Sequence, residues 1–412
     1  MIKPISKVSS HRKKYKIKNY KDLTFKAKNL TVCQDKIDNG VLLYNALLYI
    51  PKSTVVTHFF SVDNKHFFIK DQSDIYRCQY NYCSKVGEIN SPIVSFLPVK
   101  IYGQNEILVA DEFGAFIIGQ DERIANFPMC KTLCFHNGRI FTAIDNTITF
   151  FNQFDMENNS VSFTVAGTIA LDNDAGEIQG FMSNGENLYC ICKHAIFKIT
   201  CADENINFKL KREDIFGLDI KDKSFASNFG QCFFISCGKL YIFDGNLKSK
   251  DILLNNFDFT IVNNAKYNKN HYVLTAKDDE KNKFCYIFDL LTEKESVIYP
   301  NQDIIAGEEY IVVDGVVKEL FRGASLQNKN FISKPIIMAD GISTVCSMSV
   351  EVGSACTLKI SGDFGNKYYS LTSGFNDILV NLSSRSLKLE FTAQNQNFFI
   401  DNLCIVYKQR GE

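Results

Sequence analysis

Residues 188–199 read Leu188-Tyr189-Cys190-Ile191-Cys192-Lys193-His194-Ala195-Ile196-Phe197-Lys198-Ile199. One apolar run at 188–191 and a second at 195–199 flank a short polar turn. Runs of β-branched and aromatic residues bounded by a turn are typical of β-strands. Because both runs are almost continuously apolar, we expect strands that are covered on both faces. The stretch therefore predicts a buried β-hairpin.

The same unit, an apolar run followed by a polar turn and a second run, recurs at intervals of roughly 40 residues. The other copies are 66–69 with 75–76, 107–109 with 115–118, 140–143 with 148–151, 232–235 with 240–243, 272–274 with 284–288, and 310–313 with 316–317. A single hairpin cannot bury both of its faces, so similar hairpins at the length of a four-stranded blade predict radial stacking. We expect a six- or seven-bladed β-propeller, with a large irregular sandwich or an open meander as alternatives.

The pattern changes after Arg322-Gly323. Apolar and polar residues alternate strictly at 346–352 and again at 387–391, which indicates strands with one solvated face. About seven such segments lie between residues 331 and 408, enough for a β-sandwich of Ig-like or jelly-roll type. The sequence thus predicts an all-β protein with a basic N-terminal arm and entry strand at 1–45, a β-propeller at 46–323 and a C-terminal β-sandwich at 324–412.

The charges balance over the whole chain, with 46 Lys and Arg against 46 Asp and Glu in 412 residues. No global field therefore draws the protein to nucleic acid or to an anionic membrane. Neither a secretion signal nor an apolar stretch of membrane-spanning length is recognisable, so we expect no membrane partner and a protein kept in the cytoplasm or in a particle assembled there.

The first 28 residues are an exception, since they hold ten Lys or Arg and the single acid Asp22. Their alternating segment 15–18 suits a strand added to a neighbouring sheet. The basic segment is an assembly arm, a solvated tail, or a site where lysines meet phosphates and tyrosines stack on bases. We favour the assembly arm and expect the partner contacts at Arg12, Lys13, Lys14 and Lys16.

Most of the 14 cysteines lie inside apolar runs, as Cys190, Cys192 and Cys232 do. Buried reduced thiols behave as small hydrophobic groups, so these residues are expected in the core.

No motif of a catalytic or metal site stands out. The group Cys130, Cys134 and His136 approaches a zinc spacing, but no second ligand pair follows it. Residues 171–177 place alternating carboxylates before a glycine, as a calcium loop does, but lack the bidentate Glu. We expect no metal, no cofactor and no catalytic residue. A hydrolase with clustered acids in the central pocket of the propeller is the competing interpretation.

A longer pattern spans residues 133–199. It consists of Leu133-Cys134-Phe135-His136-Asn137-Gly138-Arg139-Ile140-Phe141, Asn152-Gln153-Phe154-Asp155, Phe163, Asp174-Ala175-Gly176-Glu177-Ile178-Gln179-Gly180 and the strand pair at 188–199. The pattern resembles a segment of phage tail propeller proteins, the nozzle or tail-stabilisation family of short-tailed phages. The family often has Trp or Tyr followed by Ser before the Asp turn, where this chain has Phe150-Phe151-Asn152.

The resemblance implies a non-enzymatic structural protein of a phage or phage-like tail, located in the virion and in the host cytoplasm during assembly. Such a propeller would form a homo-oligomeric ring around the tail axis and dock to other tail or portal-side proteins, with Arg139 as a further contact. Nucleic acid would meet at most the N-terminal arm. The alternative is a receptor-binding tail module whose C-terminal sandwich grips glycan through Tyr368, Tyr369 or Phe375.

Overall fold

The chain is all-β in its computed structural model, which describes residues 12–52, 54–89, 95–111, 113–120, 122–200, 208–228, 230–338 and 341–409. Helical structure in these ranges is limited to the α-helix α1 (Tyr20–Leu23) and two 3-10 turns, η1 (Asn173–Ala175) and η2 (Leu253–Asn256). None of the helices in the described ranges is long and apolar enough to cross a membrane.

The chain divides into two compact units. Unit 1 contains the residues up to 44, residues 286–299 and the residues from 320 onward. Unit 2 contains residues 45–285 and 300–319. The boundary falls within the strand β28 (Lys283–Asp289).

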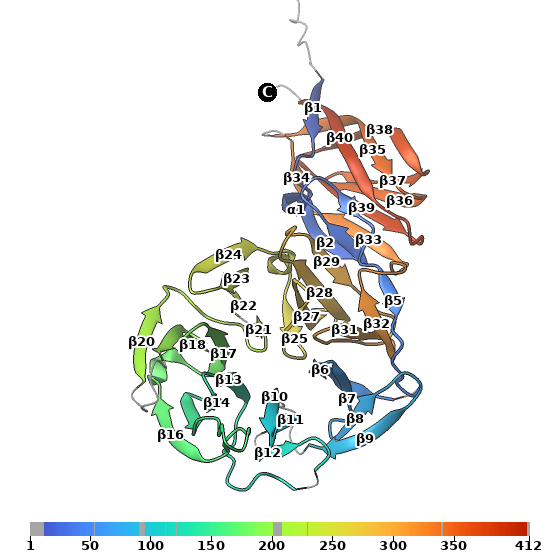
Figure 1. The fold of residues 1–412 in the computed structure, drawn as a ribbon. Coiled ribbons are helices and arrows are strands. Elements are labelled where there is room, and N and C mark those ends of the chain that lie inside the picture. The colour runs from blue at the N-terminus through green and yellow to red at the C-terminus, as the bar shows by residue number, and fades with distance from the viewer. Residues whose placement is uncertain are drawn as a thin grey trace, which may run out of the picture. The chain divides into compact units, whose positions relative to one another are not determined.

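Unit 2 consists of successive antiparallel sheets, most of them four-stranded, whose strands follow one another along the chain (Figure 1). The first three sheets contain β6 (Val56–Val62), β7 (Lys65–Lys70), β8 (Asp74–Cys78) and β9 (Cys83–Glu88); β10 (Ser95–Ile101), β11 (Gln104–Asp111) and β12 (Gly114–Ile117); β13 (Thr132–His136), β14 (Arg139–Ile144), β15 (Thr147–Phe151) and β16 (Val165–Ala170). The next two contain β17 (Ile178–Asn184), β18 (Asn187–Cys192), β19 (Ala195–Thr200) and β20 (Lys209–Asp214); β21 (Ala226–Asn228), β22 (Gln231–Ser236), β23 (Lys239–Phe243) and β24 (Leu247–Asp251). The remaining strands are β25 (Phe259–Ile261), β26 (Lys266–Asn268) and β27 (His271–Asp278), then β30 (Ile304–Ala306), β31 (Tyr310–Val313) and β32 (Val316–Leu320).

The predicted hairpins are confirmed as the second and third strands of these sheets. The stretch at 188–199 forms β18 and β19 in antiparallel register, with Cys190 opposite Phe197 and Ile191 opposite Ile196. The same pairing joins β7 to β8, β11 to β12, β14 to β15, β22 to β23 and β31 to β32.

The sheets of unit 2 are arranged in a cycle. The first strands of successive sheets contact one another in the order β6, β10, β13, β17, β21, and β21 then contacts β26. The strand β27 contacts β30, and β30 contacts β6, which returns to the start. This closed order gives unit 2 the character of a β-propeller.

The last sheet takes in backbone from the N-terminal part of the chain, beside the strand β5 (Leu43–Asn45). The amide of Ala46 donates to the carbonyl oxygen of Val317 at 2.9 Å. The Lys318 ammonium donates to the Asn45 side-chain oxygen at 2.5 Å. Residues far apart in the sequence therefore complete one sheet.

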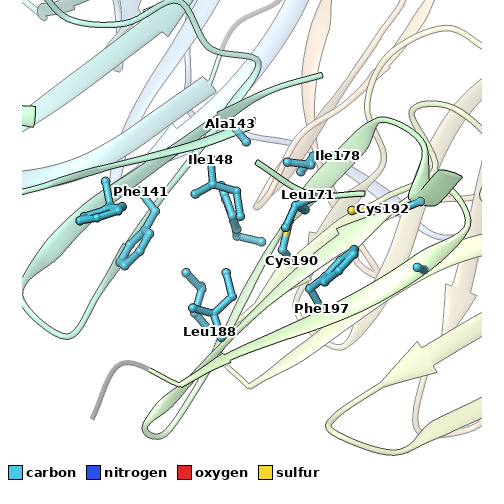
Figure 2. Packing of buried hydrophobic residues seen from close by; sticks show 14 residues of the cluster. Phe141, Ala143, Ile148, Leu171, Ile178, Leu188, Cys190, Cys192 and Phe197 are labelled. Atoms are coloured by element: carbon cyan, nitrogen blue, oxygen red, sulfur yellow. The ribbon is translucent and has the colours of Figure 1, made fainter. Parts of the chain in front are cut away.

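Apolar side chains fill the spaces between neighbouring sheets of unit 2. Figure 2 shows one such cluster, in which Phe141 and Ile148 meet Leu188, Cys190 and Phe197. All five side chains are at most 1% exposed. The prediction that cysteines in apolar runs are core residues is confirmed at Cys190 and also at Cys192 and Cys232, which are buried free thiols.

Unit 1 contains two groups of paired strands. One runs in the order β2 (Thr24–Lys28), β33 (Lys329–Ser333), β39 (Ser386–Ala393), β36 (Cys356–Gly362) and β37 (Gly365–Leu371), with β34 (Ile336–Ile337) paired to β39. The other runs in the order β29 (Glu295–Ile298), β3 (Leu30–Val32), β4 (Ile37–Asp38), β40 (Ile400–Gln409), β35 (Ser343–Val352) and β38 (Gly374–Ser384), with β1 (Lys13–Lys16) paired to β40. Buried and more exposed residues alternate along β35 and β39, as the sequence pattern predicts.

A buried lysine holds two distant segments of unit 1 together. The side chain of Lys329 is fully buried, and its ammonium donates to the carbonyl oxygen of Asn29 at 3.1 Å and to Oγ of Ser325 at 3.0 Å. Burial lowers the pKa of Lys329 to about 8, while the charge of Asp38 acts in the opposite direction.

Candidate functional site

The basic residues expected to contact partners lie on an exposed strand. Arg12 is exposed, and Lys13, Lys14 and Lys16 belong to β1, all of whose residues are exposed. The strand pairs antiparallel with β40, and the Lys13 ammonium donates to Oε1 of Gln409 at 3.2 Å. The arm therefore pairs as a strand with β40 of the same chain.

The register of β1 sets each of its lysines opposite a residue of β40, in the strand group of unit 1 that also contains β35. Lys14 lies opposite Val406, which lies opposite Ser347 on β35. Lys16, two residues further along β1, lies opposite Cys404. Within the described ranges β1 pairs only with β40, so its other edge presents free backbone donors and acceptors beside a row of lysines.

Arg139, the other expected contact residue, is buried at 6% exposure. It is the first residue of β14, and its Nη1 donates to the carbonyl oxygen of Phe151, the last residue of β15, at 3.0 Å. Gly138 before it has a φ of 74°, and its carbonyl accepts from the amide of Phe154 at 2.6 Å. The guanidinium therefore stabilises its own hairpin and turn.

The other parts of the segment 133–199 also form turns and close contacts. The carboxylate of Asp155 accepts from the amides of Glu157 and Asn158, each at 3.0 Å. A Cβ placed on Gly180 would lie 2.1 Å from Cε1 of Phe225, so only glycine fits against that ring.

The carboxylates of the predicted calcium-like segment are bound by a guanidinium. Nη1 of Arg212, on β20, lies 2.9 Å from Oδ2 of Asp172 and 2.7 Å from Oδ1 of Asp174. This hydrogen bond lowers the pKa of Asp174. No group of three or more His, Cys, Asp or Glu residues in the described part of the chain is arranged to hold a metal ion.

The residues with zinc-like spacing lie in different surroundings. Cys130 is buried in the core between the β10 and β13 sheets, and burial raises the pKa of its thiol to about 12. Cys134 packs against the cluster on the other face of the β13 sheet. Nδ1 of His136 lies 2.7 Å from Oγ of Ser183. The structure does not bring the three side chains together as a ligand set.

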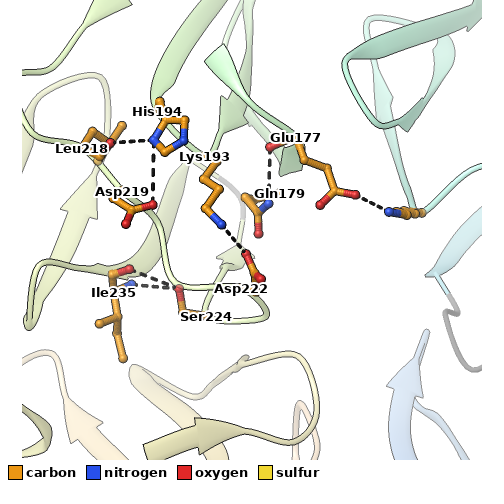
Figure 3. Close-up of polar contacts among 10 residues, drawn as sticks. Glu177, Gln179, Lys193, His194, Leu218, Asp219, Asp222, Ser224 and Ile235 are labelled. Carbon is orange, nitrogen blue, oxygen red and sulfur yellow. Dashed lines mark hydrogen bonds and ion pairs between the residues drawn. The ribbon is translucent and has the colours of Figure 1, made fainter. Parts of the chain in front are cut away.

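A central cavity of about 650 Å³ is lined by residues from all the sheets of unit 2. Its carboxylates include Glu177 and Glu308, which pair with Lys131 and Lys266, the second pair at 2.6 Å. Asp222 also lines the cavity and accepts from Lys193 at 3.3 Å, as Figure 3 shows. Acids thus do gather around the centre, but lysines neutralise these three.

The combination of Ser61, His66 and Glu309 beside this cavity contains the residue types of a catalytic triad. Oγ of Ser61 lies 2.8 Å from Nδ1 of His66, and Oε2 of Glu309 lies 3.7 Å from the same nitrogen. In a triad the acid and the nucleophile bind opposite nitrogens of the imidazole. These three residues therefore lack the geometry of a charge-stabilised base that activates a hydroxyl.

A second cavity, which we call the lysine cavity, has a volume of about 640 Å³. Its lining includes the charged residues Lys223, Lys266, Lys277, Lys283 and Asp303 together with His58. These residues come from separate strands and turns of unit 2 and form no motif along the chain, so sequence reasoning did not find them. What the charged residues of the cavity share is an excess of positive charge, with four lysines against the single carboxylate of Asp303.

Exposed aromatic residues lie on unit 1. Tyr368 is 65% exposed and Phe375 is 61% exposed, while the hydroxyl of Tyr369 donates to the carbonyl oxygen of Leu379 at 3.0 Å. The Lys359 ammonium lies 6.0 Å from the ring centroid of Tyr368. Two of the three predicted sugar-stacking residues therefore present their rings to solvent.

A scan against models of protein families finds no match, and no curated protein matches the sequence. The WD40 domain of Neurospora crassa Pan2 is a similar solved structure, 8% identical over 65% of this chain and 89% of that chain, with a TM-score of 0.41. The computationally designed Ika8 protein is 11% identical over 68% of this chain and 99% of that chain, with a TM-score of 0.39. YCF48 bound to D1 peptide is 11% identical over 68% of this chain and 94% of that chain, with a TM-score of 0.36. At TM-scores this low, these proteins inform neither the function nor the partners of the chain.

Proposed function

We propose that the sheets of unit 2 form a seven-bladed β-propeller in which backbone near β5 completes the last blade. We further propose that the two strand groups of unit 1 face each other as a β-sandwich. Alternating buried residues on β35 and β39, such as Val350 and Leu389, support this arrangement because each strand has one apolar face to cover.

We propose that the protein is a non-enzymatic structural component of a phage or phage-like tail, which assembles as a ring around the tail axis and docks to neighbouring tail or portal-side proteins. The observation that carries this proposal is the open edge of β1 with the exposed Lys13, Lys14 and Lys16. An unpaired strand edge accepts a strand from another chain, and the lysines favour an acidic one. Since Arg139 is buried in its own hairpin, the proposed contacts are the four N-terminal basic residues.

The test is the mass of the full chain in solution by light scattering, compared with a variant in which Lys13, Lys14 and Lys16 are replaced by Glu. Truncation further into the chain is unsuitable, because Tyr20 is buried and β2 belongs to unit 1. We expect a ring-sized oligomer that the charge reversal dissolves. A monomer in both samples would contradict self-assembly through β1.

A glycan-binding receptor module is the second candidate, and the exposed rings of Tyr368 and Phe375 favour it. Sugars commonly stack on exposed aromatic faces. A glycan array with the full chain and with the Tyr368→Ala, Phe375→Ala double variant tests it. Binding that the double variant loses would support this candidate, and an array without signal would remove it.

A further inference from the structure

The lysine cavity carries more positive charge than its carboxylates neutralise. Nζ of Lys283 lies 2.6 Å from Oδ1 of Asp303, which neutralises one of its lysines. A second lysine, Lys266, pairs with Glu308 at the wall that the cavity shares with the central cavity. Two lysines remain for a ligand.

These two lysines have no carboxylate partner among the residues that the structure describes. The Lys223 ammonium donates to the carbonyl oxygen of Val262 at 3.0 Å, and the exposed Lys277 has no side-chain partner there. Two unneutralised ammonium groups match the charge of a phosphate dianion, which lysine binds as a point charge.

A buried histidine reports the same positive potential. Nδ1 of His58 is buried without a hydrogen-bond partner in the described part of the chain. Burial lowers the pKa of His58 to about 4, and the charges of Lys266 and Lys223 act in the same direction. His58 is therefore neutral at pH 7 and faces charges that an anion would compensate.

The rest of the wall is mixed, with the polar Thr57 and Gln72 beside apolar residues, of which Val55 is 60% exposed and Phe96 is half-buried. The volume of about 640 Å³ is that of a site for a small organic molecule rather than for a bare ion. We propose that the lysine cavity binds a small organic phosphate, whose phosphate group is held by Lys223 and Lys277 and whose apolar body lies against Val55 and Phe96. This site is independent of the assembly role proposed above.

The binding test uses the full chain and phenyl phosphate in isothermal titration calorimetry at low ionic strength. We expect phenyl phosphate to bind about tenfold more tightly than inorganic phosphate, because the ring loses contact with water. Phenol, which lacks the charge, should not bind. Glycerol 3-phosphate should bind more weakly than phenyl phosphate, and equal or tighter binding would overturn the apolar part of the site.

Single variants assign the phosphate contacts. Lys223→Met and Lys277→Met should each weaken phenyl phosphate binding by about tenfold or more. Lys209→Met is the matched control, because Lys209 is an exposed lysine on β20 that does not line the cavity. Unchanged affinity in both cavity variants, or an equal loss in the control, would overturn the proposal.

An NMR titration of the wild-type chain gives a readout that does not depend on the folding of the variants. We expect saturating phenyl phosphate to raise the pKa of His58 above about 4, because the anion offsets the charges of Lys223 and Lys266. His58→Gln identifies the resonance. A His58 pKa that stays the same with and without phenyl phosphate would overturn the proposal.

Discussion

The ammonium group of Lys329 donates a hydrogen bond to the carbonyl oxygen of Asn29 across 3.1 Å while the lysine side chain is fully buried. The bond joins the N-terminal part of unit 1 to β33. The donor is an ammonium group in a buried environment, which disfavours its charged form. The stability of the protein therefore depends on pH through Lys329.

Lys329 should make the protein more stable as the pH rises from about 8 to 10.5, since its pKa is lowered from 10.5 to about 8. In this range the unfolded chain keeps the proton that the native chain has lost, so the free energy of unfolding increases, by about 3 kcal/mol in total. The measurement is urea denaturation of the wild type and Lys329→Met across this range. Taking the difference between the two removes the titration of other groups, and a difference that does not change with pH would contradict the assignment.

His58 should act in the acid range. Its pKa is lowered from 6.5 to about 4 by burial and then by Lys266 and Lys223, so the unfolded chain binds a proton that the native chain refuses. The free energy of unfolding should fall by about 3 kcal/mol as the pH drops through this window. Thermal unfolding of the wild type and His58→Gln at both ends of the window checks this. A loss of equal size in the variant would assign the effect to other groups.

Replacing Arg139 with Met should destabilise the protein by about 2 kcal/mol, because the buried carbonyl of Phe151 loses its charged donor. Arg77→Met is the control, since Arg77 is only partly buried on β8 and has no side-chain partner among the described residues. Urea denaturation should separate the two variants. Equal stability of both would mean that the Arg139 hydrogen bond contributes little.

Gly180→Ala should cost about 1–3 kcal/mol, because the new Cβ would overlap the ring of Phe225. Phe225→Leu shortens the obstructing side chain, so the double variant should recover part of the loss. The four proteins of this double-mutant cycle are compared by denaturant unfolding. Strictly additive losses would show that the two residues do not meet.

Calcium should not stabilise the wild-type chain. Arg212 already binds Asp172 and Asp174, so a cation would have to displace its guanidinium. Melting temperatures with calcium and with a chelator should agree. A rise in the melting temperature with calcium would contradict this account of the segment.

The recurring hairpins were predictable because each strand pair is local and its two runs are buried on both faces. Cys190 and Phe197, which are opposite each other on β18 and β19, belong to one short segment whose pattern already contains the pairing. The strand pairing within unit 1 was harder to predict from the sequence. There β29 at 295–298 pairs with β3 at 30–32, and nothing in either segment specifies such a distant partner.

The candidate sites also differ in whether they depend on local sequence or on contacts between distant segments. The basic character of β1 is visible in the sequence, because charge repeated over neighbouring residues needs no fold to be recognised. The lysine cavity was not visible, because Lys223 and Lys277 approach the same space only after the sheets have closed. Arg139 was recognised as part of a turn, but its burial depends on the neighbouring strand and could not be read from the turn itself.

The hydrogen bond between Ala46 and Val317 has a consequence for how the protein is made. Asn45 and Lys318, which are bonded beside it, lie 273 positions apart in the chain. The N-terminal backbone of this sheet is synthesised early and must wait with unpaired amides until its partner leaves the ribosome. This sheet can therefore be completed only late in synthesis, and the unpaired edge of the nascent chain is open to pairing with other chains during that interval.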